Sequence, residues 1–388
     1  MEPTNDWLDN FEREEVVRVA VVLTPRSQLA GPDDLVPGGV RAYGSGCGSR
    51  LRALRSRLAP ATIRAVKPAA RTALAIAAAG AVSAAYQRVA EMRDRRRYPA
   101  PGELVDIGGG RKMHVLVEGN GEPPVVIIPA LGANVLEWVR VLRAASAETT
   151  VCTYDRAGLG WSDQPRGPTT IDGMADDLHE LLKGAGIAPP YIIAGHSMGG
   201  IVARRFRSRH PADVAGMLLI DSSHEIQARR FSDDRYWDTL KRAARRQVRI
   251  LGLRRLGVRA GVVGGFDAAS LNRETVPEYT GAARAVSLTA KQRRAVVREL
   301  LLLARPQGQP QNLGDLPLTV LSAGNAKRRQ WADWDTWCEL QDELAALSSR
   351  SAHMYAMNAG HCVQLDDPGV VGQAIADLVR QYRGDRTG

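Results

Sequence analysis

Residues 195–200 carry the clearest chemistry in this chain, because they read Gly-His-Ser-Met-Gly-Gly. This Gly-x-Ser-x-Gly pattern follows the apolar run 191–194 and precedes a helix-like run. A serine in a tight strand-to-helix turn stands above a sheet, where oriented amides at the helix N-terminus favour negative charge. Strand and helix nearly touch at such a turn, so Gly195 and Gly199 supply the missing bulk that it requires. We therefore predict that Ser197 is a nucleophile, the alternative being a plain glycine-rich turn.

A serine hydroxyl is a weak nucleophile and needs a base within hydrogen-bonding reach. The chain has seven histidines, of which His361 is the best candidate. It follows the last apolar strand pattern, closes the sequence Ala-Gly-His, and precedes a helix that begins near Pro368. His196 lies next to Ser197 in the sequence, but its side chain should point away from the serine, so we expect it to pack. The alternative for His361 is a structural histidine on the surface.

The elements that must position these residues alternate along the chain from about residue 103. Apolar strands that alternate with helices argue for a mostly parallel sheet with helices on both faces. Between residues 224 and 313 the alternation stops and helical periodicity is favoured, which predicts a helical lid on the Ser197 side. The sequence predicts strands at residues 104–107, 112–117, 125–128, 151–154, 191–194, 217–220, 318–321 and 353–357, and helices at 171–182 and 369–382.

The N-terminal quarter differs in composition from the rest. Residues 1–60 are polar or basic and lack the basic n-region of a secretory signal, so we expect a partly disordered extension and no cleavable signal peptide. Residues 61–97 predict an alanine-rich helix in which residues 72–86 carry no charge. That run is shorter than the ~20 residues of a spanning helix. It predicts either membrane association, as an anchor or interfacial helix, or a soluble helix that packs against the protein. The protein is accordingly expected to be cytoplasmic or membrane-associated.

The bulk composition excludes several classes of function. The formal net charge of +10 suits anionic partners, but a solvated arginine-rich surface explains it as well, and no nucleic-acid-binding signature accompanies it. Four scattered cysteines, with no Cys-x-x-Cys or His/Cys spacing, predict neither structural zinc nor a disulfide framework. We expect no metal, no cofactor and no nucleic-acid partner.

Five motifs follow one another along the chain, at residues 125–132, 154–162, 195–200, 219–224 and 358–361. In this order and spacing they resemble the α/β-hydrolase superfamily, in its serine-nucleophile, esterase- and lipase-like branch. The resemblance covers about residues 98 to 383. It implies an eight-stranded, mostly parallel sheet, a core of residues 98–223 and 314–388, and a helical lid of residues 224–313 inserted after the sixth strand. The epoxide-hydrolase and dehalogenase branches use aspartate where Ser197 stands.

The third member of a triad is a carboxylate that holds the tautomer of the imidazole. The family usually places it after the seventh strand, where this chain has Asn325. Some members place it after the sixth strand, and Asp221 stands there, so we predict Asp221. Asp333 and Asp335 are the alternatives, and Asp221 could instead cap its strand.

An oxyanion hole needs two N–H donors aimed at the developing charge. One should be the amide of Met198, next to the nucleophile. The other should come from the loop after the third strand, where many relatives have His-Gly and this chain has Pro-Ala-Leu-Gly at residues 129–132. We predict the amide of Leu131.

These residues together predict a serine hydrolase of the carboxylesterase type. It would cleave a carboxylic ester or a related acyl compound, a small-molecule substrate, through an acyl-enzyme intermediate. Two alternatives are an acyltransferase or thioesterase with the same mechanism, and a non-catalytic homologue that binds a small molecule.

Overall fold

The computed structural model describes residues 68–231, 255, 276–325 and 333–387. The chain divides into two compact units, residues 1–77 and 78–388, so the larger unit begins inside the predicted alanine-rich helix. That helix, α2, spans Pro68–Arg97. The expected disordered extension, residues 1–60, lies outside the described residues. Within the described ranges, none of the helices combines the length and the apolar character needed to cross a membrane. Association of residues 72–86 with a membrane surface remains a prediction.

The larger unit contains the eight-stranded sheet that the sequence predicts, in the order β1-β2-β4-β3-β5-β6-β7-β8. β2 is antiparallel to both of its neighbours, whereas every other pair is parallel. The carboxyl ends of the central strands therefore lie at one edge of the sheet. The strands are β1 (Glu103–Asp106), β2 (Lys112–Glu118), β3 (Val125–Ile128), β4 (Val151–Tyr154), β5 (Tyr191–His196), β6 (Val214–Ile220), β7 (Leu318–Ala323) and β8 (Ser351–Ala356).

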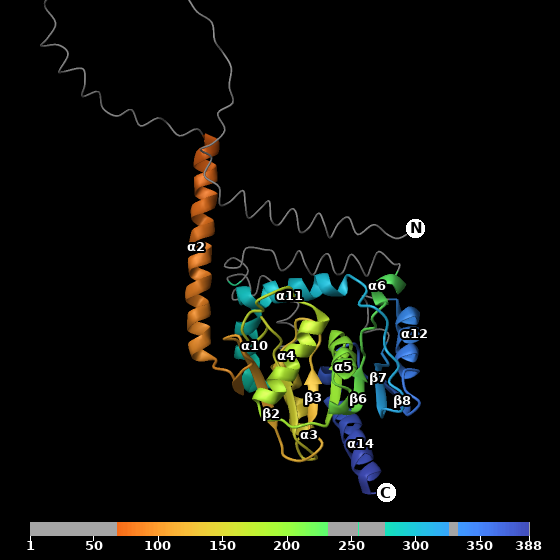
Figure 1. Cartoon of the computed structure of the whole chain (residues 1–388). Helices are drawn as coiled ribbons and strands as arrows, with labels where there is room; N and C mark the ends of the chain where they lie inside the picture. Colours follow the sequence, from red (N-terminus) through yellow and green to blue (C-terminus); the bar gives the residue numbers. More distant parts are fainter. Residues whose placement is uncertain (1–67, 232–254, 256–275, 326–332, 388) are drawn as a thin grey trace, which may run out of the picture. The chain divides into compact units, whose positions relative to one another are not determined.

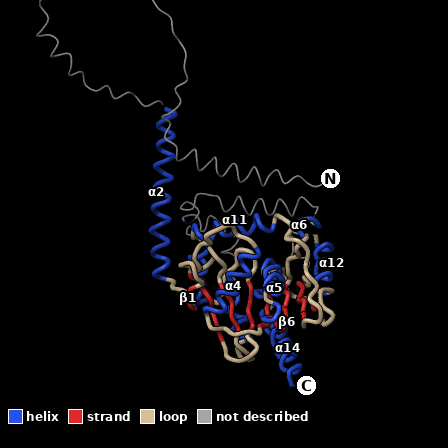
Figure 2. The backbone as a smooth tube through the Cα atoms, viewed as in Figure 1, coloured by secondary structure: helices blue, strands red, loops and turns tan. Residues whose placement is uncertain are grey.

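Helices cover both faces of this sheet (Figures 1 and 2). α4 (Ile171–Gly184) and α5 (Met198–Arg209) pack against each other on one face. On the other face, α3 (Val139–Ala145) packs against α14 (Pro368–Thr387). Two hydrophobic clusters fill the spaces between these layers, one for each face. The predicted doubly covered sheet is thus confirmed.

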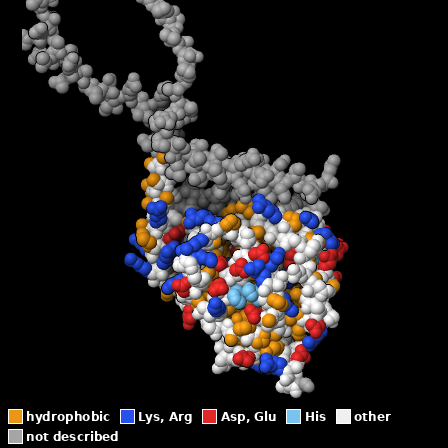
Figure 3. Space-filling view, viewed as in Figure 1, with side chains coloured by type: hydrophobic (Ala, Val, Ile, Leu, Met, Phe, Trp, Pro, Cys, Tyr) orange, Lys and Arg blue, Asp and Glu red, His pale blue; other side chains and the backbone are white. Residues whose placement is uncertain are grey.

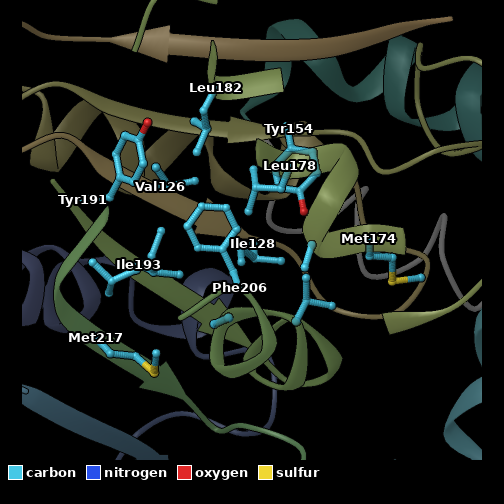
Figure 4. Packing of buried hydrophobic residues seen from close by; sticks show 14 of the residues in the cluster. Val126, Ile128, Tyr154, Met174, Leu178, Leu182, Tyr191, Ile193, Phe206 and Met217 are labelled. Carbon is cyan, nitrogen blue, oxygen red and sulfur yellow. The ribbon is translucent and has the colours of Figure 1, made fainter. Parts of the chain in front are cut away.

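The hydrophobic cluster between the sheet and helices α4 and α5 explains how short apolar strands are held in place. Val126 and Ile128 of β3 and Ile193 of β5 point from the sheet toward Phe206 of α5 and Leu178 of α4 (Figure 4). All of these side chains are fully buried. Burial of each large apolar side chain contributes about 1.5–3 kcal/mol, so this layer holds the strands in the register that brings their ends together.

Within the predicted lid, residues 224–313, most of the described residues up to 303 are helical, whereas residues 304–313 form a turn and loop. Their role as a lid stays a prediction. Residues 232–254 and 256–275 of the predicted lid lie outside the described part of the chain. α11 lies across the end of the domain at which the parallel strands finish (Figure 1). The described elements are α6 (Gln227–Arg230), the 3₁₀ turn η3 (Pro277–Tyr279), α10 (Thr280–Ser287) and α11 (Ala290–Leu303).

The part of α2 that belongs to the larger unit contacts the junction between α10 and α11. The Gln87 side chain donates to the carbonyl of Leu288 at 2.7 Å, and the Glu91 carboxylate accepts from the amide of Ala290 at 2.8 Å. Glu91 thereby satisfies an amide at the start of α11 that has no partner within its own helix. The N-terminal helix therefore helps to fix where α11 begins.

The charged surface is mixed rather than segregated on the face shown in Figure 3. Lys and Arg side chains lie among Asp and Glu side chains there, instead of gathering into one basic patch. Arg209 of α5, for example, pairs with Asp176 of α4 at 2.7 Å. For this face, the pattern favours the solvated-surface interpretation of the net charge.

Candidate active site

Ser197 stands between β5 and α5, with φ 52° and ψ −123°. A non-glycine residue at positive φ stores roughly 1–3 kcal/mol of strain, which surrounding contacts must compensate. Here the Ser197 amide donates to the carbonyl of Ile220 at 3.1 Å, and the Ser197 carbonyl accepts from the amides of Gly200 and Ser223, each at 2.9 Å. The backbone of the turn is therefore held by its own helix and by the end of β6. The residue is 6% exposed.

Close approach of strand and helix explains the glycines around Ser197. A Cβ added to Gly195 would lie 2.6 Å from the carbonyl oxygen of Gly199. A Cβ added to Gly199 would lie 2.1 Å from the carbonyl oxygen of Ile128. Both contacts involve backbone atoms that cannot move aside, so the sequence-based reason for glycine at these positions is confirmed.

His361, in the loop after β8, connects the serine to an acid. Its Nε2 lies 3.0 Å from Ser197 Oγ, and its Nδ1 lies 2.6 Å from Oδ2 of Asp221. An ionised carboxylate can only accept, so Nδ1 carries the proton and Nε2 is left to accept from the serine hydroxyl. This is the tautomer that general-base catalysis requires. The His361 side chain is 19% exposed and that of Asp221 is fully buried.

Asp221 directly follows β6 and has φ 37°. Its Oδ1 accepts from the amide of Ala323 at 3.1 Å and from the indole Nε1 of Trp337 at 2.9 Å. Hydrogen bonds from an amide and an indole stabilise the anionic form of a carboxylate that burial would otherwise disfavour. Trp337 belongs to α12 (Trp334–Ala345), and its ring also meets the His361 ring edge-on, with centroids 5.8 Å apart.

The alternative acids occupy other positions. Asp333 is exposed and caps α12, accepting from the amide of Asp335 at 3.2 Å and from the hydroxyl of Thr336 at 2.8 Å. Asp335 is also exposed. Asn325, which stands where an acid is common, donates its backbone amide to the carbonyl of Ala359 at 3.0 Å. That contact joins the loop after β7 to the loop that carries the histidine.

Leu131 lies in the loop of residues 129–132 between β3 and η1 (Val135–Trp138), and Met198 is the first residue of α5. No acceptor among the described residues takes a hydrogen bond from the amide of Leu131 or of Met198. Within that part of the chain both amides lack a protein acceptor, and their role in an oxyanion hole stays a prediction. The neighbouring amide of Gly132 is different, because it donates to the Glu299 carboxylate at 2.7 Å.

Arg156 ties this segment to the rest of the domain, because it donates to the carbonyls of Pro129 and Ala130. It pairs with Glu299 at 2.8 Å, and both side chains are 2% exposed. Burial acts to lower the pKa of Arg156, but the Glu299 charge and hydrogen bonds outweigh it and leave the pKa raised. The guanidinium therefore stays cationic, as its partner requires.

Three contacts of this site were not predicted from the sequence. Trp337 donates to Asp221, Glu299 accepts from Gly132, and the ring of His196 bonds through Nε2 to the carbonyl of His361 at 2.8 Å. The histidine beside the nucleophile thus steadies the histidine loop. All three join residues more than a hundred positions apart, and no local pattern signals them.

One cluster among the described residues has the side chains of a metal site. His179, His210 and Asp213 lie together, near the end of α5 opposite to Ser197. The two imidazole rings are stacked, with centroids 4.0 Å apart and planes within 3° of parallel. Their nitrogen lone pairs therefore run side by side instead of converging on one point. This arrangement fits a stacked pair of rings better than a chelate.

Comparisons with known proteins agree with the observed architecture. The model of the α/β-hydrolase fold family matches residues 123–368. Among curated proteins, the uncharacterized protein YqjL of Bacillus subtilis is 25% identical over 261 residues, which cover 67% of this chain and 85% of YqjL. The chain spans less than half the length of several other curated relatives that it matches.

Two solved structures illustrate the range of proteins with this fold. A thermophilic esterase from Thermogutta terrifontis is 22% identical with a TM-score of 0.53, covering 72% of this chain and 97% of the esterase. A putative acyltransferase from Salmonella enterica is 18% identical with a TM-score of 0.57, covering 73% of this chain and 97% of that protein. Likeness at this level of identity establishes the fold and leaves the reaction to the residues of the site.

Proposed function

The chain belongs to the α/β-hydrolase fold family, and on this premise we propose that it is a serine hydrolase that cleaves a carboxylic ester or a related acyl compound. The observation that supports this most strongly is the continuous hydrogen-bonded chain from Ser197 Oγ through His361 to Asp221, with links of 3.0 and 2.6 Å. A serine at the strained turn distinguishes this chain from family branches whose nucleophile is aspartate.

The proposed reaction has two acyl-transfer steps. His361 takes the proton of Ser197 as the hydroxyl attacks the ester carbonyl, and Asp221 stabilises the imidazolium that forms. The amides of Leu131 and Met198 stabilise the oxyanion. His361 then protonates the leaving alkoxide, and water enters and repeats the sequence to release the acid. Strain at Ser197 serves this chemistry because the turn holds the hydroxyl above the ends of the strands before any substrate binds.

Labelling with a fluorophosphonate probe tests the proposal without knowledge of the natural substrate. The wild-type protein should become covalently modified at Ser197 and should hydrolyse short p-nitrophenyl esters. Ser197→Ala should lose both properties and should unfold at an unchanged temperature. Ser208→Ala, which removes a hydroxyl from the other end of α5, provides the matched control and should retain both. Turnover that persists in Ser197→Ala would refute the role of the serine.

Product analysis separates hydrolysis from acyl transfer. With a p-nitrophenyl ester and an added alcohol or thiol, a hydrolase releases mainly the free acid, whereas an acyltransferase forms the new ester or thioester. We propose hydrolysis, so the acid should dominate.

A further inference from the structure

The loop of residues 129–132, called here the oxyanion loop, is held almost entirely by side chains that lie outside it. Arg156 donates from Nη1 to the carbonyl of Pro129 at 2.5 Å and from Nη2 to the carbonyl of Ala130 at 2.6 Å. Gln292 donates to the carbonyl of Gly132 at 2.7 Å, while Glu299 accepts from the Gly132 amide at 2.7 Å. Three carbonyls and one amide of the loop therefore form hydrogen bonds with side chains from other elements.

Two of those side chains come from one stripe of the lid helix α11. Gln292 and Glu299 are seven residues apart, so they lie two turns apart on the same face of the helix. Val296 lies between them on that face, and a Cβ added to Gly132 would lie 2.9 Å from its Cγ2. Gly132 itself has φ +69°. The helix thus packs directly on the loop and bonds both the amide and the carbonyl of its last residue, Gly132.

Both polar groups on α11 are also anchored to the body of the protein. Glu299 forms a two-point pair with Arg156, through contacts of 2.8 and 2.9 Å. Gln292 accepts from the amide of Gly160 at 2.8 Å. Two-point and charge-assisted contacts fix direction as well as distance.

We propose that Gln292 and Glu299 are positioning residues of the oxyanion hole, and that the lid helix α11 is part of the catalytic apparatus as well as a cover over it. By occupying the amide and the carbonyl of Gly132, they leave the amide of Leu131 as the donor from this loop that faces the oxyanion. The inference rests on the proposed function. It assigns to α11 an effect on the rate of the chemical step, separate from any effect on substrate binding.

Steady-state kinetics with p-nitrophenyl butyrate tests this assignment. Gln292→Leu and Glu299→Gln should each lower kcat at least tenfold with KM within twofold of wild type, because a displaced donor weakens only the transition state. Their affinity for an alkyl trifluoromethyl ketone, whose adduct with serine carries an oxyanion, should fall by a similar factor. Arg294→Gln, a change at an exposed position of the same helix, should leave kcat, KM and the affinity for the ketone unchanged.

Gln292→Leu leaves the buried charge pair intact, so it keeps the test decisive if Glu299→Gln fails to fold. Wild-type kcat and wild-type ketone affinity in Gln292→Leu would overturn the inference, while leaving the serine mechanism standing. Parallel rises in KM and loss of thermal stability without a fall in kcat would also overturn it, because they indicate a purely structural contact.

Hydrogen–deuterium exchange tests the contacts between α11 and the oxyanion loop without any substrate. The peptide that covers the oxyanion loop should exchange at least tenfold faster in Glu299→Gln than in wild type, because the Gly132 amide loses its carboxylate acceptor. Unchanged protection would contradict the inference. A wild-type protein that turns over no ester, combined with faster exchange in the variant, would reject the proposed function and still support the coupling between α11 and the loop.

Discussion

Replacement of Trp337 by phenylalanine isolates one contact of the proposed triad. The indole Nε1 donates to Oδ1 of Asp221 at 2.9 Å, and the amide of Ala323 donates to the same oxygen at 3.1 Å. Trp337→Phe removes the indole donor and retains an aromatic ring against His361. The carboxylate keeps its bond to the imidazole but loses the indole donor on its other oxygen.

The expected loss follows from the burial of this carboxylate. Asp221 is 0% exposed, so water cannot replace the missing donor. A hydrogen bond to a charged group is worth about 1.5–3 kcal/mol. If that difference is felt wholly in the transition state, where the imidazolium faces the carboxylate, kcat/KM should fall by roughly 10- to 150-fold. The smaller ring should also lower the unfolding free energy by about 1–3 kcal/mol, because Trp337 is 2% exposed.

Turnover of p-nitrophenyl acetate and thermal unfolding, measured on the same samples, check both numbers. Trp161→Phe is the matched control, because its indole donates to a backbone carbonyl, that of Tyr98, at 3.2 Å and contacts no member of the triad. The control should lose some stability and keep its activity. A folded Trp337→Phe protein with kcat/KM within threefold of wild type would refute the reasoning, as would an equal loss of activity in Trp161→Phe.

Three further predictions concern the turn, the lid and the pH dependence of stability. Gly200→Ala should lower the unfolding free energy by about 1–3 kcal/mol in denaturant titrations, since its Cβ would lie 1.8 Å from the hydroxyl of Ser222. Glu91→Ala should cost about 1 kcal/mol in the same assay, because it leaves the amide at the start of α11 uncapped; an unchanged midpoint would argue against the contact. Burial lowers the pKa of Lys291 from 10.5 to about 8, so the unfolded chain binds more protons between these values. The unfolding free energy of wild type should therefore rise from pH 8 to pH 10.5, by up to about 3 kcal/mol, relative to Lys291→Met; parallel pH profiles would exclude this.

The features of this protein that could be predicted from the sequence are those that depend on contiguous residues. Apolar runs of four to six residues mark the buried strands, because a strand covered on both faces has no polar side. The turn at Ser197 is equally local, since the need for glycine arises from neighbours two positions away. The proximity of Asp221 and His361 was predictable because each lies within five residues of the end of a strand, β6 or β8, and these ends lie at the same edge of the sheet.

The contacts that orient these residues were not predictable, for a physical reason. Trp337 reaches Asp221 across 116 positions, and Arg156 reaches Glu299 across 143. Each contact joins an indole or a charged side chain on one helix or loop to a group on another, and its partner depends on how whole elements pack. In a sequence with helical periodicity, a tryptophan or a charged residue is as consistent with solvent exposure as with burial. The contact of Gln87 in α2 with the carbonyl of Leu288, across 201 positions, is equally non-local.

The sources of these orienting contacts bear on how substrate specificity can change. The strands and the loops after them position the serine, the acid and the histidine of the proposed triad, whereas one donor to the acid comes from α12 and two of the side chains that hold the oxyanion loop come from α11. α11 lies between β6 and β7, and α12 lies between β7 and β8. Because Glu299 also neutralises the buried Arg156, a lid that lacks the carboxylate leaves a charge without a partner, at a cost of about 3–5 kcal/mol. A graft of another lid onto this sheet should therefore restore turnover only when it carries an acid and an amide at the spacing of Gln292 and Glu299.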